Sequence, residues 1–526
     1  MVIPAFMPTK LHKYIIVIIL FLAIFLRGYK IDSLPSLNPD EAALGYNAYS
    51  LLQTGKDEHG IPWPLHFQSF GDYKPGGYVY LDMPFIKLLG LTPLAVRLPN
   101  LILSVLTIYV LYLLVLLVSS NSVLALISSF VLAISPWHIH FSRGAWESST
   151  ALFFLLLGIY WLYIYIIKQK ITYLYLFLIP ITLSFYFYHS VRIVAPCLFL
   201  ILFLINFKKL FRPQLIISLI IGAVITVPVL LSFLNNGGTA RFGGVGITAD
   251  YGPIARTEEL LNQHGTPLLI NRIFHNKYLL YTLSWAQKYA SHFDLNFLFV
   301  SGDEVPRSKS PDMGQLYLIE LPFLLLGIIY VLKSKTKLKP VLFSWLFTAP
   351  IASSLTFQAP SALRSLPMVI PLSVFVAAGI YYLFCLIPKS FTKIFIIIFV
   401  LIYSYSLKYY LDAYFIHAPI RYSFAWNTGF NKIVPFLQSQ KNLYQNIYFT
   451  DKYDQPYILY LFYSSYPPRL FQPQSHLTPP DKFGFSTINQ IDNITFHIPT
   501  TIPLNSLIID ASDFQFTGLS FKIYNQ

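Results

Sequence analysis

Long apolar segments separated by short polar connections dominate the first 411 residues of the chain. Each segment has roughly 17 to 22 residues and rarely contains a charge, which is the length of α-helix that crosses about 30 Å of hydrocarbon. The pattern predicts an α-helical polytopic membrane protein with about eleven transmembrane helices. We expect them at residues 11–29, 98–118, 123–140, 150–167, 171–188, 193–207, 214–234, 316–332, 340–357, 367–387 and 394–411.

The first apolar segment also resembles the core of a signal peptide. Its uninterrupted part, Tyr14–Leu26, has only 13 residues. However, no small-x-small cleavage site follows it, and the flanking Lys13 and Arg27 can reach the membrane surface from within the helix, which extends the usable span. We therefore predict a retained anchor.

Clusters of positive charge mark one side of the membrane. Alternate connections carry lysine and arginine without any acidic residue, except the uncharged turn near Ser119 to Ser122, and all 23 Asp and Glu fall in, or at the outer edge of, segments on the other side. By the positive-inside rule, this predicts a cytoplasmic N-terminus, external loops at 29–97 and 235–315, and an external segment 412–526. The clustered basic residues are Lys168, Lys170, Lys208, Lys209, Arg212, Lys333, Lys335, Lys337, Lys339, Lys389 and Lys393.

Residues 412–526 are a different kind of sequence from the transmembrane domain 1–411. They mix short β-like runs with turns that contain Pro and Gly, which predicts a small external mixed α/β domain at the C-terminus. The β-like runs are Asn446–Thr450, Ile494–Ile498 and Ser506–Asp510.

Composition supports a membrane protein. Hydrophobic residues make up 55% of the chain and charged residues 11%, and the mean hydropathy is +0.57, whereas about a quarter of a soluble chain is charged. The net charge of +14 is typical of nucleic-acid binding, but the basic residues form short clusters rather than one polar face. We expect membrane lipid and no nucleic acid as partners.

The polar interval after the first apolar segment holds an unusual set of charges. Asn38 is expected to cap a short helix that begins at Pro39, with Glu41 as its capping-box partner. This local role explains the helix but not Lys74. The alternative is that the helix presents Asp40 as a general base at the membrane surface, near Lys74, which would bind a phosphate.

Four basic residues far apart in sequence fall on the external side of the predicted topology. Any one of them alone can bind lipid head groups or reach the interface. Positive charge on the outer side opposes the usual bias, so together they predict an anion site. The candidate phosphate-binding and donor-binding residues are Lys74, Arg143, Arg192 and Arg364, with His189 and Tyr78 from the same polar stretches.

These motifs, in this order and on this side, resemble the polytopic C-type glycosyltransferases. The resemblance is to the branch of dolichyl-phosphate-mannose protein mannosyltransferases and bacterial lipid-A aminoarabinose transferases, and it covers about the first 410 residues. The motifs are Asp40-Glu41, Tyr73-Lys74-Pro75, Arg97-Leu98-Pro99, Phe141-Ser142-Arg143, and the turns at Arg192 and Arg364.

The resemblance implies a reaction and residue roles. A sugar would pass from a polyprenyl-phosphate donor to a hydroxyl of a protein, lipid or glycan, at the outer face of a prokaryotic plasma membrane. The family's catalytic aspartate matches Asp40, beside Glu41, and its phosphate-binding lysine matches Lys74. The leaving phosphate is already ionised, so catalysis needs cations and a base, and direct attack would invert the anomeric carbon.

One departure from the family concerns a metal. The aminoarabinose transferases carry an acidic residue just before that lysine, where this chain has Tyr73, although Asp72 is one residue away. His138 and His140 are two residues apart, a spacing that suits metal ligation only on a strand or loop. A divalent metal is left open, and no cofactor is assigned.

Two other functions stay open. A transporter or flippase of a lipid-linked sugar would carry ionisable residues in mid-membrane and internal repeats, and neither is visible in the sequence. A surface-polysaccharide ligase or polymerase would carry paired arginines or a histidine in a late external loop, and the loop 235–315 contains Arg241, Arg256, Arg272 and His264.

Overall fold

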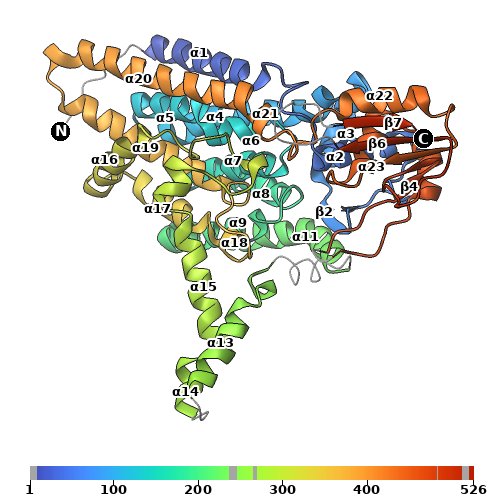
Figure 1. The fold of residues 1–526 in the computed structure, drawn as a ribbon. Coiled ribbons are helices and arrows are strands. Elements are labelled where there is room, and N and C mark those ends of the chain that lie inside the picture. Colours follow the sequence, from blue (N-terminus) through green and yellow to red (C-terminus); the bar gives the residue numbers. More distant parts are fainter. Residues whose placement is uncertain (1–8, 236–245, 265–268, 482–483, 512–520, 526) are drawn as a thin grey trace.

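The computed structural model describes residues 9–235, 246–264, 269–481, 484–511 and 521–525. Helices form the main body, a mixed sheet forms one end of it, and a helical arm leaves the body sideways (Figure 1). Arg241, one of the loop arginines considered above, lies outside the described residues.

Every one of the eleven predicted apolar segments falls on helix. Six described helices are long and apolar enough to cross a membrane, or seven if two consecutive helices that meet at a bend of 59° form one span. The other predicted spans fall on shorter helices. The protein is therefore an integral membrane protein, while the count of eleven stays a prediction. The six spans are Leu11–Gly28, Pro93–Ser119, Glu147–Lys168, Pro213–Asn235, Leu366–Leu386 and Lys389–Arg421.

The helices of the body follow one another through short connections, except between α1 and α4 and between α11 and α16, where long segments intervene. In chain order they are α1 (Thr9–Gly28), α4 (Pro93–Ser119), the bent pair α5 (Ser122–Ile134) and α6 (Pro136–Ser142), α7 (Glu147–Lys168), α8 (Ile171–Ser184), α9 (Val191–Ile205), α10 (Phe207–Leu210), α11 (Pro213–Asn235), α16 (Glu320–Lys333), α17 (Leu338–Thr348), α18 (Ile351–Ser354), α19 (Val369–Leu386), α20 (Thr392–Asp412) and α21 (Ala418–Arg421).

Glycine sets the closest helix contact in the body. A Cβ atom at Gly327 of α16 would lie 1.7 Å from the Phe375 carbonyl oxygen of α19, and one at Gly379 would lie 1.9 Å from the Phe323 carbonyl oxygen. The two backbones therefore touch at a pair of glycines, the arrangement that small residues allow between membrane helices.

Arg27, near the end of α1, does not reach the membrane surface as predicted. It is fully buried, and its NH1 group donates hydrogen bonds to the carbonyls of Ala23 and Ala133 at 3.3 and 2.8 Å. The last carbonyls of a helix need donors. Arg27 supplies donors to the carbonyls at the end of α5, which explains why its side chain points into the protein and not to the membrane surface.

The segment between α1 and α4, which the sequence predicts to be an external loop, folds into two helices and a hairpin. α2 (Pro39–Thr54) is followed by the antiparallel strands β1 (His66–Ser69) and β2 (Asp72–Pro75), and then by α3 (Gly77–Leu89). The two residues of the turn, Phe70 and Gly71, have φ values of +59° and +83°. Positive φ at both positions is what a tight type I′ hairpin requires, so the turn fixes the register of the strands.

The C-terminal region is a mixed α/β domain, as predicted. The order of its sheet is β4-β5-β3-β6-β7, with β3 parallel to β5 and β6 and the outer strands antiparallel. Strands β3, β5 and β6 fall on the predicted runs, although β5 is shorter than predicted. The elements are α22 (Phe430–Gln440), β3 (Asn446–Phe449), α23 (Pro456–Tyr463), α24 (Pro468–Phe471), β4 (Gln490–Ile491), β5 (Ile494–Thr495), β6 (Ser506–Ala511) and β7 (Phe521–Asn525).

This domain packs directly on α2, in the segment between α1 and α4 (Figure 1). The Tyr46 hydroxyl donates to the Tyr466 carbonyl at 3.1 Å, and the Gln472 side-chain amide donates to the hydroxyls of Ser50 and Thr54 at 3.2 and 3.0 Å. α2 is thereby held between the C-terminal domain and the helical body.

The arm interrupts the body between α11 and α16. It consists of α13 (Gly252–Gln263), α14 (Leu269–Phe274) and α15 (Lys277–Ser291), and α13 packs along α15. Two contacts fix its root. The Tyr289 hydroxyl donates to the Phe347 carbonyl of α17 at 2.8 Å, and the imidazole of His292 lies 2.7 Å from the Ser353 hydroxyl of α18.

Candidate functional site

The predicted capping box fixes the start of α2. The side chain of Asn38 accepts the backbone N–H of Glu41 at 3.0 Å, and the Glu41 carboxylate accepts the backbone N–H of Asn38 at 3.2 Å. Pro39 occupies the first helical turn. Asp40 is thus held at the N-terminal end of a helix, where the helix dipole favours an ionised carboxylate.

Asp40 and Lys74 form an ion pair, in which the lysine ammonium donates to one carboxylate oxygen. Lys74 comes from β2, 34 residues along the chain, and its ammonium also lies 5.2 Å from the centre of the Phe70 ring. The side chain of Asp40 is 40% exposed, whereas that of Lys74 is 15% exposed. The sequence singled out both residues, and the structure brings them into contact with the carboxylate as the more accessible partner.

Carboxylates surround Lys74. Burial acts to lower its pKa, but the charges of Asp40, Glu147 and Asp72 outweigh this effect and raise the pKa above its ordinary value. Glu147 begins α7 and Asp72 begins β2, so separate elements supply these charges. The lysine is consequently a permanent cation at neutral pH and can exchange one anionic partner for another.

Glu41, the residue after Asp40, has different surroundings. Its side chain is 2% exposed, and Arg97 donates to both of its oxygens at 2.7 Å. The backbone N–H of Ala145 donates to the same carboxylate at 2.8 Å. Arg97 also donates to the Ile31 carbonyl at 2.8 Å. Glu41 therefore ties α2 to the end of α1, the start of α4 and the turn before α7.

Arg192 contacts the hairpin through His66, which the sequence analysis did not identify. One Arg192 nitrogen donates to His66 Nε2 at 3.1 Å, and another donates to the Phe185 carbonyl at 3.1 Å. Burial and the nearby guanidinium lower the pKa of His66 to about 4, so the ring is neutral. Its other nitrogen, Nδ1, lies 2.9 Å from the Ser232 hydroxyl.

The hairpin lies between Arg192 and Lys74. His66 stands opposite the residue after Lys74 in the strand register, and neighbouring side chains of a strand point to opposite faces. His66 and its partner Arg192 therefore approach one face of the hairpin, and Lys74 extends from the other. His189 contacts the backbone of β2, because its Nε2 donates a hydrogen bond to the Tyr73 carbonyl at 3.2 Å.

The other candidate donor-binding residues make separate contacts. Arg364 donates to the Thr356 hydroxyl at 3.2 Å and to the Gln358 carbonyl at 3.0 Å, which holds its own turn together. Tyr78 is fully buried, and its hydroxyl donates to the Val96 carbonyl at 2.9 Å.

Arg143, which follows α6, is fully buried against the end of α1. Its NH1 and NH2 groups donate to four backbone carbonyls, those of Leu26, Arg27, Tyr29 and Leu34, at 2.7 to 3.0 Å. These bonds occupy both terminal nitrogens of the guanidinium, which are the donors that would bind a phosphate. The structure thus places Arg143 in the packing between α1 and the turn before α7, away from the charged pair.

Asp454 of the C-terminal domain also belongs to this region, although no local sequence pattern predicts it. It pairs with Arg307 at 3.4 Å. Partial desolvation and the charge of Asp40 act to raise the pKa of Asp454, whose side chain is still 54% exposed, and Arg307 and Lys74 oppose them. The carboxylate is therefore within electrostatic reach of the Asp40–Lys74 pair. Only the packing of the domain on the first loop brings it there.

The described residues contain no group of three or more His, Cys, Asp and Glu side chains that could hold a metal ion. His138 Nδ1 accepts from Arg27 at 2.7 Å, and His140 Nε2 donates to the Arg307 carbonyl at 2.7 Å. The two histidines face separate partners, and Asp40 is paired with Lys74. As placed in the described part of the chain, these residues do not fit a metal.

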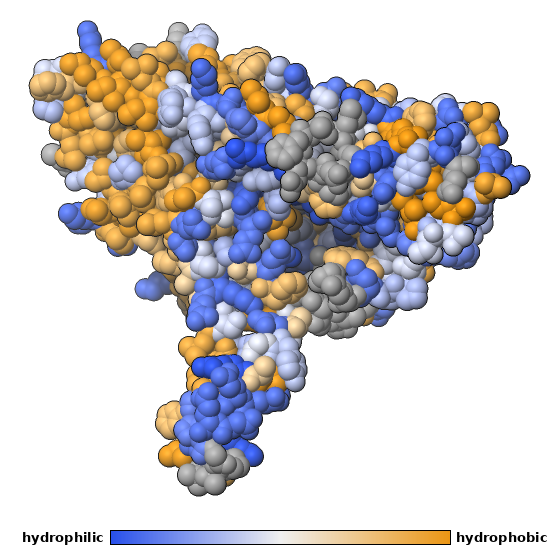
Figure 2. Space-filling view, viewed as in Figure 1, coloured by the Kyte–Doolittle hydropathy of each residue, from blue (hydrophilic) through white to orange (hydrophobic). Residues whose placement is uncertain are grey.

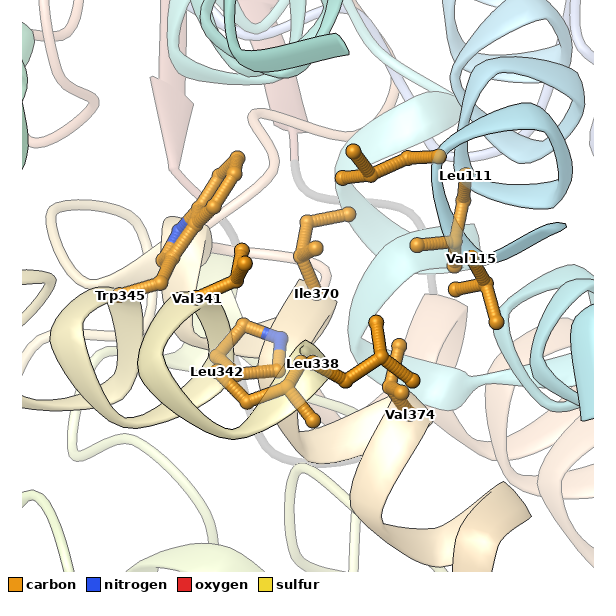
Figure 3. Close-up of a pocket in the computed structure, with 10 residues that line it drawn as sticks. Leu111, Val115, Leu338, Val341, Leu342, Trp345, Ile370 and Val374 are labelled. Carbon is orange, nitrogen blue, oxygen red and sulfur yellow. The ribbon is translucent and has the colours of Figure 1, made fainter. Parts of the chain in front are cut away.

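An apolar pocket lies in the body between α4, α17 and α19 (Figure 3). Hydrocarbon side chains line it, apart from the indole of Trp345, and its volume of about 10 Å³ is close to that of one water, so it is a packing gap with no room for a phosphate. The chemistry is therefore assigned to the charged pair and not to this pocket. The lining residues are Leu111, Leu114, Val115, Leu338, Val341, Leu342, Trp345, Ile370, Pro371 and Val374.

One family model matches part of the chain. Residues 74–231 match the model of the dolichyl-phosphate-mannose-protein mannosyltransferases. The match begins at Lys74 and includes Arg97, Arg143 and Arg192. No curated protein matches the sequence.

Solved structures resemble the chain in fold. ArnT from Cupriavidus metallidurans, bound to undecaprenyl phosphate, matches with a TM-score of 0.52 and 11% identity, over 87% of this chain and 84% of that one. The archaeal oligosaccharyltransferase AglB from Archaeoglobus fulgidus, in complex with an inhibitory peptide and a dolichol-phosphate, matches with a TM-score of 0.46 and 15% identity. That match covers 77% of this chain and 55% of AglB, so the chain spans about half the length of the archaeal protein.

These matches confirm the resemblance that the sequence predicted. The fold follows the ArnT structure over most of both chains, and the family model covers the segment that starts at the candidate phosphate-binding lysine. The family model supports the predicted class of enzyme, a glycosyltransferase, over residues 74–231, and the ArnT match supports the fold.

Proposed function

We propose that this protein is a membrane glycosyltransferase that moves a sugar from a polyprenyl-phosphate donor to an acceptor hydroxyl. The Asp40–Lys74 ion pair carries the proposal, because it joins a candidate base to a candidate phosphate-binding cation. The family match that begins at Lys74, and the fold shared with a protein that binds undecaprenyl phosphate, support this class of donor.

Donor binding begins with an exchange of partners at Lys74. The phosphodiester of a polyprenyl-phosphate sugar carries one negative charge, and the raised pKa of Lys74 keeps the lysine protonated. When the ammonium turns from Asp40 to a phosphate oxygen, the carboxylate is released beside the donor. One movement therefore binds the leaving group and frees the base.

The freed carboxylate then takes the proton of the acceptor hydroxyl. The acceptor oxygen forms a bond to the anomeric carbon, and the bond from that carbon to the phosphate oxygen breaks with its electron pair. The product, polyprenyl phosphate, gains a second negative charge, which Lys74 stabilises. A single displacement of this kind inverts the anomeric configuration.

Other residues support these two. Glu41, held by Arg97, positions α2 and therefore Asp40. We assign Arg192 and Arg364 to the phosphate as further cations, which requires Arg192 to leave His66 on the other face of the hairpin and Arg364 to leave the Gln358 carbonyl when the donor binds. The acceptor is a protein, lipid or glycan that carries a hydroxyl.

The one-sided distribution of lysine clusters supports a topology for this reaction. We assign eleven spans, a cytoplasmic N-terminus, and an active site and C-terminal domain at the outer face of a prokaryotic plasma membrane. The donor is then used on the side opposite to the lysine clusters.

The test uses the purified protein in proteoliposomes with a short-chain polyprenyl-phosphate sugar and a hydroxyl acceptor extract from the cell envelope. The expected result is acceptor-dependent release of polyprenyl phosphate. Movement of intact donor between leaflets without any release would overturn the proposal in favour of a flippase.

A further inference from the structure

The end of the helical arm exposes a group of apolar side chains. Leu269, Ile270, Ile273 and Phe274 of α14 expose 81%, 58%, 62% and 62% of their surfaces, and Tyr278 at the start of α15 exposes 73%. Single exposed apolar residues are ordinary on a protein surface, whereas contiguous groups indicate a contact with another apolar phase. We call these five residues the arm tip.

The arm tip has the spacing of one helix face. Positions 269, 270, 273 and 274 follow the i, i+1, i+4, i+5 pattern, which places them on one side of α14. The next apolar residue, Tyr278, comes four positions after Phe274. Exposed basic residues, Arg272 and Lys277, flank this face.

The arm runs crosswise to the membrane spans. In Figure 1, α1 and α20 run across the view, and the arm leaves the body downwards from α17 and α18. The lysine cluster that ends at Lys339 lies at the start of α17, and the arm is attached at Phe347, near the other end of the same helix. The root of the arm is therefore on the side of the membrane away from the lysine clusters.

We propose that the arm lies along this surface of the membrane, with the arm tip inserted among the acyl chains of phospholipids. Interfacial helices combine an apolar face with basic flanking residues, and phospholipid phosphates complement Arg272 and Lys277. Tyr281 and Trp285 follow on α15, and these residue types are enriched where a membrane meets water.

Acidic residues of the arm fall on a different helix. Glu258 and Glu259 belong to α13, and Glu259 pairs with Arg256 at 2.7 Å with both side chains about half exposed. Figure 2 shows hydrophilic surface along the arm next to hydrophobic surface. The arm therefore has a polar part suited to water and an apolar tip suited to lipid.

The surrounding body favours lipid over a second copy of the chain as the occupant. α11, the helix before the arm, is an apolar span whose outward side chains are exposed, including Ile217 at 53%, Ile220 at 58% and Val224 at 66%. Such a surface must meet hydrocarbon. The bilayer that covers these side chains also offers hydrocarbon to the arm tip, without any complementary patch on another protein.

Spin labels can locate the arm tip relative to the membrane. Cys197 and Cys385 are replaced by Ser, and a nitroxide is attached to Ile273→Cys or, as the matched control, to Glu258→Cys. Both positions are exposed, so neither label should disturb folding. The protein is reconstituted into vesicles of phosphatidylcholine and phosphatidylglycerol. Oxygen concentrates in the acyl chains and a nickel chelate stays in water, so collisions of the nitroxide with these two relaxation agents report how deep the label lies in the membrane.

We expect the label at position 273 to be severalfold more accessible to oxygen than to the nickel chelate. The label at position 258 should show the opposite preference. Equal access of nickel to both labels would place the arm tip in water and overturn the proposal. Protection of the 273 label from both reagents would mean a protein contact and would also overturn it. Ile270→Asp should move the 273 label toward water without changing the label at 258.

Discussion

Arg97 holds Glu41 through two parallel hydrogen bonds of 2.7 Å in a site closed to water. The preceding carboxylate, Asp40, meets its cation at a partly open surface. A buried bidentate pair is committed to structure, whereas an exposed pair can open for substrate. Two adjacent acids of the same motif therefore have separate roles, positioning for Glu41 and chemistry for Asp40.

Glu41→Gln should destabilise the protein strongly. It leaves a buried guanidinium without its counter-charge, a change that costs on the order of 3–5 kcal/mol. Asp40→Asn is the matched control, because a partly exposed pair contributes about 0–1 kcal/mol. Thermal unfolding in detergent should show a clear fall in Tm for the first variant and little change for the second. Equal shifts would mean that the Glu41–Arg97 pair has no special structural role.

Glu58→Gln should remove part of the pH dependence of stability. Glu58 is fully buried, and its Oε1 accepts from Asn47 at 2.9 Å. Burial raises its pKa to about 8 from an ordinary value of 4.5. Between these values the folded state binds more protons than the unfolded state, so stability falls as the pH rises.

Glutamine retains the acceptor for Asn47 and cannot ionise. The Tm of Glu58→Gln relative to wild type should therefore be higher at pH 8 than at pH 5, by roughly 1–3 °C. Thermal unfolding of both proteins at the two pH values measures this difference. An identical difference at both values would show that Glu58 titrates normally in the fold.

The parts of this region that the sequence predicted are local or chemical. The capping box of Asn38 and Glu41 lies within one helical turn, so its spacing is enough to predict it. The Asp40–Lys74 contact was expected because few other charges occur nearby and because the family pairs these roles. Strand β6 was predicted from its run of β-branched residues, while the order of the sheet depends on pairings far apart in the chain.

The parts that the sequence did not predict depend on tertiary contacts. Arg143 was expected to bind a phosphate, but it donates to carbonyls as far away as Leu26, 117 positions earlier in the chain. No periodicity reports such a contact. The same is true of Asp454, which only the packing of the C-terminal domain brings near Asp40.

Polyprenyl phosphate without a sugar should stabilise the protein against heating. A ligand at about 100 times its Kd contributes about 2.7 kcal/mol to a folded state that binds it. Lys74→Ala and Arg364→Ala should each weaken this stabilisation. Arg143→Ala should lower the Tm of the free protein, because its four carbonyl partners lose a donor, but should leave the ligand-induced shift unchanged.

Thermal-shift measurements with a short-chain polyprenyl phosphate test the three variants together. The same ligand-induced shift in wild type, Lys74→Ala and Arg364→Ala would mean that these residues are ordinary interfacial cations and that the phosphate binds elsewhere.

Reporter fusions after Lys339 and after Arg421 should lie on opposite sides of the membrane. Three predicted spans separate these positions, and the last helical segment runs to Arg421 rather than to residue 411. A reporter active only in the cytoplasm should work at the first position and fail at the second. Activity at both positions would contradict the topology.

Turnover by Asp40→Asn tests the central claim most directly. Single-turnover release of polyprenyl phosphate is measured with saturating donor and acceptor, and donor binding is followed by thermal shift in the same preparation. If Asp40 takes the proton of the acceptor, turnover should fall by roughly 10²-fold or more while donor binding persists. Near-normal turnover by this variant would contradict the assignment of Asp40 as the base.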